Sequence, residues 1–330
     1  MAGISKRLSF IFTIASAIAY ASCGGLQQAS TPLPGGAVSQ RASKPPPRDA
    51  RSGQPELYVS CFYLCRPSQG IVYIYPLAGP NQPKIGSISK GVDVPSGLSV
   101  DSHNSLYVAN SGNGTVTVYP NGSKRPSMTY SKGVHVPLFP LADSAGHVFV
   151  SGRSVFRFGP QSRGYVFEYN AGANVPIAHA RIGLEADGIA EDGQGNLYVA
   201  YRYNMHNGGS IAEFGPALSN KRLLGIKLLH APAGLLVDSA GNIVVAESGY
   251  FSIDVFPPGA KTPTVRVSVP TDKPGQLAMQ NDATTLWVSA EKSDYGAYVY
   301  YMPYPLTSST IPAQYESFYG DAQGIAVSPH

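Results

Sequence analysis

Ionisable side chains recur at one place in a repeating pattern, eight residues before the aspartate that ends an apolar segment. Asp93, His135 and His230 hold this place, and Asp272 holds the matching place further along. Carboxylates and imidazoles that converge can bind a divalent cation or perform acid–base chemistry. The competing interpretation is that these side chains cap turns or face water, because they precede proline corners. A metal site at these four residues is therefore one hypothesis, and otherwise we expect no cofactor.

A second group of residues is rich in arginine and aromatic rings and lies in or beside the loops that connect the second and third strands of a repeat. Guanidinium groups and flat rings can stack on sugars, pack against a partner chain or pair with anions. The alternative is that the rings pack beneath their own loops. The candidate ligand-binding residues are Arg153, Phe156, Arg157, Tyr201, Arg202, Tyr203 and Glu247.

A Ser-His-Asp hydrolase is not indicated, because the sequence has no nucleophile elbow and no oxyanion motif. We assign no catalytic residue, and the sequence favours a binding protein over an enzyme.

The elements that position these residues repeat along the chain. A three-residue apolar core occurs six times, and the spacings between its copies, 49, 42, 49, 46 and 43 residues, are typical of propeller blades. The copies begin at Leu57, Leu106, Val148, Leu197, Ile243 and Leu286. Within a unit, an apolar strand ends in Asp, a tight turn follows, and a third strand ends in an aromatic residue and a breaker. We therefore predict an all-β fold with six blades of four antiparallel strands.

The two ends of the chain predict how the ring closes. The first repeat begins at its second strand, around Leu57, and residues 323–328 match a first strand that has no partners after it. We expect this C-terminal strand to complete the first blade, which removes exposed edges. The starts of the first strands and the connections between second and third strands then share one face, which we call the loop face. Its connections vary in length, and such loops commonly carry binding sites.

Composition bounds the function. Hydrophobic residues make up 43% of the chain and charged residues 13%, which indicates a globular protein. The formal net charge of +4 is small for 330 residues, so nucleic-acid binding is not supported. We expect a monomer.

The N-terminus has the order of a secretory signal, with Lys6 and Arg7 followed by an apolar run over residues 8–21. This run is too short to span a bilayer comfortably. Residues 20–24 resemble a bacterial lipobox, in which Cys23 is lipidated and becomes the first mature residue. Residues 19–21 also suit ordinary signal peptidase. We expect a cell-envelope lipoprotein that meets the membrane only through its lipid, with a soluble periplasmic or secreted protein as the alternative.

The domain boundaries follow from composition. Residues 1–22 are the predicted signal peptide, residues 23–54 are a tether rich in Gly, Ser and Pro, and residues 55–330 are the propeller. Cys61 and Cys65 are close enough in sequence to form a disulfide in an oxidising compartment, and two free thiols are the alternative.

The order Pro-x-Gly, apolar strand, Asp, Gly-Asn turn, Leu-Tyr-Val-Ala and Val-Tyr-Pro resembles NHL-repeat proteins. It resembles more loosely the six-bladed family of gluconolactonases and streptogramin lyases. The closest copies are residues 101–110 and 238–247. The resemblance implies the fold, whereas both binding scaffolds and enzymes use it.

One enzyme that resembles this pattern, the peptidylglycine amidating lyase, has metal-binding His residues directly after the Pro that opens each first strand. The corresponding residues here are Ser96, Leu138, Asp187, Ala233, Gly275 and Gln323, and none is His. This lyase activity is therefore not supported.

Our leading hypothesis is an extracytoplasmic binding or scaffold propeller that engages a protein or glycan of the cell envelope through the loop face. The alternative is a metal-assisted lactonase or lyase that uses the Asp and His ring.

Overall fold

The structure of the protein is a computed structural model. It describes residues 54–62, 65, 69–206, 208–226, 229–269, 272–292 and 296–329. The chain divides into two units, Met1–Pro46 and Pro47–His330, and all described residues belong to the second. The predicted signal peptide, the lipidation site Cys23 and most of the predicted tether lie outside the described residues.

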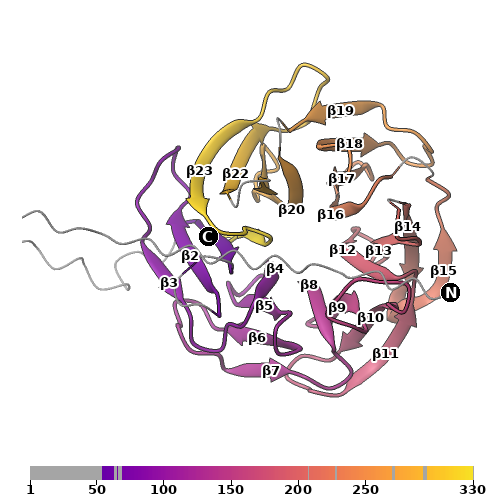
Figure 1. The fold of residues 1–330 in the computed structure, drawn as a ribbon, viewed down its shortest axis with the longest axis horizontal. Helices are drawn as coiled ribbons and strands as arrows, with labels where there is room; N and C mark the ends of the chain where they lie inside the picture. Colours follow the sequence, from indigo (N-terminus) through magenta and orange to yellow (C-terminus); the bar gives the residue numbers. More distant parts are fainter. Residues whose placement is uncertain are drawn as a thin grey trace, which may run out of the picture. The chain divides into compact units, whose positions relative to one another are not determined.

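The second unit consists of six four-stranded antiparallel sheets (Figure 1). Blade 1 contains β24 (Ile325–Val327), β1 (Glu56–Cys61), β2 (Ile71–Pro76) and β3 (Gly86–Ile88). Blade 2 contains β4 (Pro95–Val100), β5 (Leu106–Asn110), β6 (Thr115–Tyr119) and β7 (Met128–Tyr130). Blade 3 contains β8 (Val136–Ala142), β9 (Val148–Arg153), β10 (Gly164–Tyr169) and β11 (Pro176–Arg181).

The remaining blades follow in chain order. Blade 4 contains β12 (Glu185–Glu191), β13 (Leu197–Arg202), β14 (Gly209–Gly215), the 3-10 turn η2 (Pro216–Leu218) and β15 (Ser219–Leu223). Blade 5 contains β16 (Pro232–Val237), β17 (Ile243–Glu247), β18 (Ser252–Phe256) and β19 (Val265–Ser268). Blade 6 contains β20 (Lys273–Met279), β21 (Thr285–Glu291), β22 (Gly296–Pro303) and β23 (Ala313–Tyr319).

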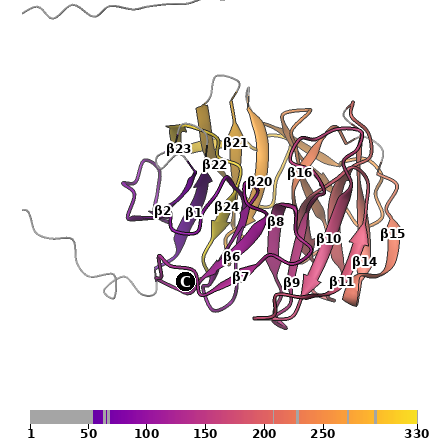
Figure 2. The same cartoon turned by 60° about the horizontal axis from the view of Figure 1, so that its bottom comes forward.

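The ring closes as predicted. The innermost strands β4, β8, β12, β16, β20 and β24 contact one another in sequence around the centre, and β24 contacts both β20 and β4. The pairs Leu57↔Val327 and Val59↔Ile325 join β1 to β24, which lie side by side in the turned view (Figure 2). One blade therefore contains strands from both ends of the chain, and no innermost edge is left unpaired at this seam.

Hydrophobic layers lie between neighbouring blades. At the seam, Leu57 and Val59 of blade 1 pack with Trp287 and Tyr315 of blade 6, and all four side chains are buried. The strands alternate side chains between their two faces, so each blade contributes to two such layers. The apolar triplets of the repeat are therefore buried on both sides, except that Tyr198 of blade 4 is only half-buried.

Aspartate turns join the first and second strands, as the spacing predicts. Asp192 Oδ1 accepts the backbone N–H groups of Gln194 and Asn196, both at 2.9 Å, and Gly195 has φ = 80°. Asp238 repeats the arrangement with Ala240 at 2.9 Å and Asn242 at 2.8 Å. The Asp carboxylate thus replaces backbone partners in the turn, and Gly supplies the left-handed conformation.

The Gly of the Pro-x-Gly motif allows adjacent innermost strands to meet. A Cβ atom on Gly324 would lie 2.1 Å from Ser96 O, and one on Gly188 would lie 2.3 Å from Ala233 O. Phe139 and Gln276 hold the equivalent position in blades 3 and 6. These two large side chains therefore enter the centre of a ring whose other blades have Gly there.

Candidate functional site

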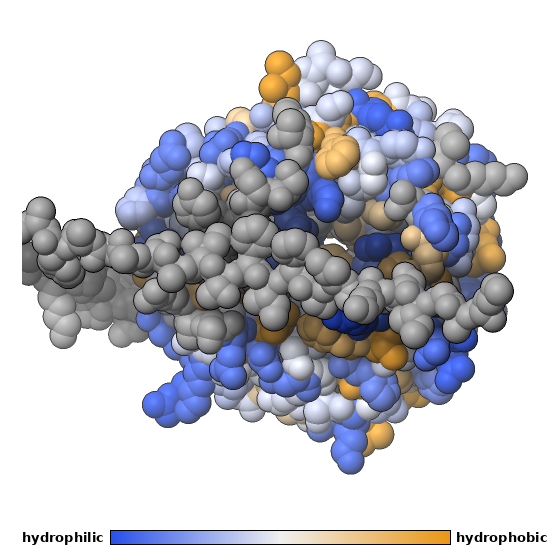
Figure 3. Space-filling view, viewed as in Figure 1, coloured by the Kyte–Doolittle hydropathy of each residue, from blue (hydrophilic) through white to orange (hydrophobic). Residues whose placement is uncertain are grey.

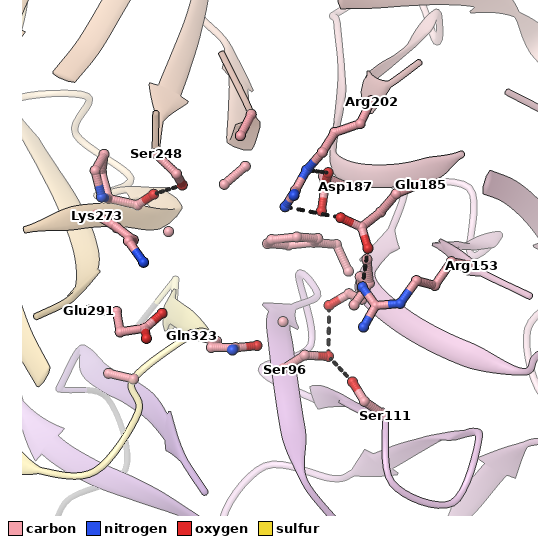
Figure 4. Close-up of a pocket in the computed structure, with 18 of the residues that line it drawn as sticks. Ser96, Ser111, Arg153, Glu185, Asp187, Arg202, Ser248, Lys273, Glu291 and Gln323 are labelled. Carbon is pink, nitrogen blue, oxygen red and sulfur yellow. Dashed lines mark hydrogen bonds and ion pairs between the residues drawn. The ribbon is translucent and has the colours of Figure 1, made fainter. Parts of the chain in front are cut away.

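A cavity of about 610 Å³ opens at the centre of the loop face. The residues that follow the motif Pro, or its Ala equivalent, all line it: Ser96, Leu138, Asp187, Ala233, Gly275 and Gln323. The ends of second strands contribute Arg153, Arg202 and Glu291 to the lining, and Ser248, directly after β17, lines the cup as well (Figure 4). Its volume is in the range typical of small-molecule sites. We call this cavity the cup.

The wall of the cup at blades 3 and 4 contains an ion-pair network. Glu185 lies directly opposite Arg202 in the β12–β13 register, and its Oε1 is 3.0 Å from Arg202 Nη2. Its other oxygen accepts a hydrogen bond from Arg153 Nη1 of the neighbouring blade. Arg202 Nε is also 3.4 Å from Asp187 Oδ2, an ion pair without hydrogen-bond geometry. The network therefore joins two blades and holds both guanidinium groups in place.

Burial controls the protonation of this wall. Burial, followed by the charge of Glu185, raises the pKa of Asp187 well above its usual range, against the attraction of Arg202 and Arg153. Burial by itself would lower the pKa of Arg202, but Asp187 and Glu185 outweigh it and raise that pKa. Arg202 therefore stays charged, whereas Asp187 takes up a proton more readily than an exposed carboxylate does.

The wall at blade 6 has the opposite arrangement of charge. Lys273 of β20 lies directly opposite Glu291 of β21, so the base is on the first strand and the acid on the second. Both side chains face the cup (Figure 4). Asp321 directly precedes Ala322, which lines the cup. Burial, followed by the charge of Glu291, raises the pKa of Asp321 to about 6.

The long connection between β9 and β10 supports the arginines from outside. Arg153 donates hydrogen bonds to Val155 O at 3.1 Å and to Phe156 O at 2.9 Å. The ring of Phe158 lies 5.0 Å from Arg202 Cζ, a cation–π contact. Phe156 itself remains 57% exposed at the margin of the cup. Part of this connection therefore fixes the arginines and part stays open to solvent.

Phe139 marks the inner limit of the cup. It lines the cup and also a second cavity of about 180 Å³ deeper in the ring, which Gln276 borders as well. The deeper cavity is lined almost entirely by apolar residues of the innermost strands. The polar chemistry of the ring centre is thus concentrated at the loop face.

Comparison with known proteins agrees with this geometry. The NHL repeat family model matches residues 93–119, which run through the first three strands of blade 2. The chain is a six-bladed β-propeller that carries an NHL repeat. No curated protein is similar enough in sequence to count as a relative.

Solved structures share the propeller fold. One chain from a crystal structure of a nidogen/laminin complex aligns with a TM-score of 0.62 and 14% identity, over 83% of this chain and 98% of that one. A protein of unknown function from Bacteroides caccae aligns with a TM-score of 0.60 and 11% identity, over 84% of this chain and 100% of that one. At these identities the likeness concerns the fold.

The propeller brings three of the seven candidate ligand-binding residues to the cup, namely Arg153, Phe156 and Arg202. Arg157 and Tyr203 are exposed outside its lining. Tyr201 is buried and packs in the hydrophobic layer between blades 3 and 4.

Glu247, the seventh candidate, is buried below the loop face. It accepts the backbone N–H of His230, while its Oε1 atom has no hydrogen-bond partner among the described residues. Burial raises the pKa of Glu247 to about 8. It does not line the cup.

The four residues of the metal hypothesis do not line the cup. His135 is exposed beside Tyr165, and the His230 ring lies 4.6 Å from that of Tyr250. Asp272 is buried and accepts a hydrogen bond from Tyr300 Oη. Within the described residues, no three His, Cys, Asp or Glu side chains are grouped so that they could hold a metal ion. The cup therefore does not bring these four residues together.

The sequence analysis did not assign Lys273 or Glu291 to the site, and Glu185 was not among its four candidate metal ligands. Glu185 and Lys273 both precede the motif Pro or its Ala equivalent by one residue, and Glu291 is the cross-strand partner of Lys273. Asp187 and Gln323 had been considered only as positions that lack His. The charged residues Glu185 and Lys273 could therefore have been found in the sequence directly before the motif Pro or Ala, one residue after the positions of the metal hypothesis.

Other expectations concern the cysteines and the membrane. The structure joins Cys61 and Cys65 by a disulfide. No helix in the described part of the chain is long and apolar enough to cross a membrane.

Proposed function

We propose that this chain is an extracytoplasmic binding propeller whose loop face engages a protein partner. The observation that carries the proposal is a set of exposed apolar side chains on the second-to-third connections of three successive blades. They are Val155 and Phe156 in blade 3, Tyr203 and Met205 in blade 4, and Tyr250 and Phe251 in blade 5. We call this set the rim.

The rim has the chemistry of a protein interface. Phe156 is 57% exposed and Tyr203 is 50% exposed, although folding alone gives no reason to present large rings to water. Aromatic residues beside arginines are enriched at the centres of protein interfaces. Hydrophobic and hydrophilic residues both surround the central hollow in the space-filling view (Figure 3). The propeller fold of one chain of the nidogen/laminin complex is compatible with such a role.

Two observations support a location outside the cytoplasm. The N-terminal sequence has the order of a secretory signal with a lipobox-like end at Cys23. The Cys61–Cys65 disulfide is typical of oxidising compartments. Lipid attachment at Cys23 and the envelope location belong to this proposal. The lactonase or lyase alternative is not favoured, because the cup-lining positions have no His.

Site-specific photo-crosslinking tests the rim directly. A photoreactive phenylalanine analogue is placed at Phe156 or Tyr203 in the producing cells, and Ile177, which is 52% exposed on the outer strand β11, serves as the apolar control position. We expect discrete, protease-sensitive adducts from the two rim positions and none from Ile177. Adducts of equal yield at Ile177, or none at the rim, would contradict the proposal. Protease-resistant adducts that stain for sugar would identify a glycan instead.

A further inference from the structure

The charged side chains of the cup differ in exposure, so a ligand contacts some of them and not others. In the network at blades 3 and 4, the side chain of Glu185 is 1% exposed, whereas those of Arg153 and Arg202 are 18% and 28% exposed. The Asp187 side chain is 7% exposed. The carboxylates thus lie behind the guanidinium groups, and the accessible part of this wall is cationic.

A second cation faces this wall. Lys273 is exposed, and within the described part of the chain its ammonium group has no hydrogen bond or ion pair. The nitrogen atoms of Lys273 and Arg202 face the cavity from opposite sides (Figure 4). Glu291 is the carboxylate that remains partly exposed in the cup, beside Lys273.

The arginines are also held in advance of binding. Arg153 is fixed by Glu185 and by two backbone carbonyls, and Arg202 by Glu185, Asp187 and the Phe158 ring. A guanidinium group that is already ordered loses little entropy when it binds an anion. Each still has N–H groups beyond those used in these contacts, because a guanidinium carries five.

We propose that the cup receives the carboxylate of an acidic side chain on an exposed segment of the protein partner, whose neighbouring apolar residues contact the rim. This inference rests on the proposed function and names the chemistry of the partner. A single carboxylate suits the cup because Glu185 offsets part of the positive charge and the partly exposed Glu291 would repel a more highly charged anion. Because burial raises the pKa of Asp187, this carboxyl group is protonated more readily and then cancels less of the positive charge of the wall.

Selection from a displayed library of random peptides tests the inference on the full propeller. On the wild type we expect enrichment of Asp or Glu beside apolar residues. Lys273→Glu removes an exposed cation that the fold does not use, so we expect it to abolish this enrichment and to weaken a selected peptide by about tenfold or more. The matched control is Lys221→Glu on the outer strand β15, where the residue is exposed and remote from the cup lining.

Each outcome decides the matter. Acidic enrichment that depends on Lys273 and not on Lys221 supports the inference. Enrichment without acidic residues, or no enriched peptide at all, overturns it. Lys273-dependent binding to an array of uronic-acid oligosaccharides, without peptide binding, would overturn a protein source for the carboxylate. The crosslinking yields at Phe156 and Tyr203 are measured separately, so failure here leaves the proposed function to its own test.

Discussion

Gln276 Oε1 accepts the backbone N–H of Leu98 at 2.9 Å, although the two residues are 178 positions apart in the chain. The same oxygen accepts the N–H of Ile325 at 3.1 Å, and Gln276 Nε2 donates to Leu98 O. Gln276 belongs to blade 6, Leu98 to blade 2 and Ile325 to blade 1. One side-chain amide therefore joins three blades at the seam where the chain's ends meet.

Replacing this amide weakens closure. Gln276→Leu keeps similar volume but leaves the Leu98 and Ile325 N–H groups without their acceptor, so we expect a loss of about 2–4 kcal/mol in the free energy of unfolding. Urea denaturation measures the effect. Gln314→Leu, at an exposed position of β23, is the control and we expect it to change stability little. Equal stability of the two variants would show that the amide does not hold the seam.

Close approach of the innermost strands predicts a sharp dependence on glycine. Gly324→Ala places a Cβ 2.1 Å from Ser96 O, so we expect the strands to separate and stability to fall by about 1–3 kcal/mol. Gly193→Ala is the matched control, because a Cβ there meets nothing within 4 Å. Thermal unfolding of both variants tests the prediction, which fails if their melting temperatures fall alike.

Glu247 links stability to pH. Its pKa in the folded protein is raised to about 8, so between about pH 4.5 and pH 8 the folded state binds more protons at this site than the unfolded state. Its contribution to stability therefore falls as pH rises through this window. Glu247→Gln keeps an acceptor for the His230 N–H and does not ionise. We expect a smaller decrease in melting temperature between pH 5 and pH 8, which lie within this window, in this variant than in the wild type. A decrease equal to that of the wild type would contradict the assignment.

Two ion pairs of different burial provide another comparison. Glu185→Gln removes the charge that balances Arg153 and Arg202, so we expect a loss of about 3–5 kcal/mol in the free energy of unfolding. The pair of Arg222 with Glu213 involves an arginine side chain that is 67% exposed, so Glu213→Gln should cost about 1 kcal/mol or less. Denaturant titration of both variants checks this order. Similar losses would mean that burial does not decide the importance of these pairs.

The sequence predicted the blades because their signals are local. An apolar triplet such as residues 57–59 indicates a buried strand, and a turn sequence such as that at Asp238 indicates the conformation of the turn. Closure by β24 also followed, because the first repeat lacks a first strand. The positions of side chains at the ring centre depend instead on register between strands and on contacts between blades.

The cup shows this difference most clearly. Asp93 and His135 lie one residue before Val94 and Val136, where the equivalent blade 4 residue is the cup-lining Glu185. Successive residues of a strand point to opposite sides, so a shift of one position changes which side chains face the cavity. Lys273 and Glu291 lie opposite each other because of the β20–β21 register, which the spacing of motifs does not reveal.

The reversed pairs Glu185–Arg202 and Lys273–Glu291 also affect how a partner can be oriented. The backbone repeats at about every sixth of a turn, so a partner that recognised the blades alone would find six nearly equivalent orientations. Charge removes this equivalence, because the acid precedes the base in blade 4 and follows it in blade 6. A rigid ligand with its own charges can then bind in one orientation about the ring axis. The charged side chains select this orientation, whereas the six similar blades alone would not.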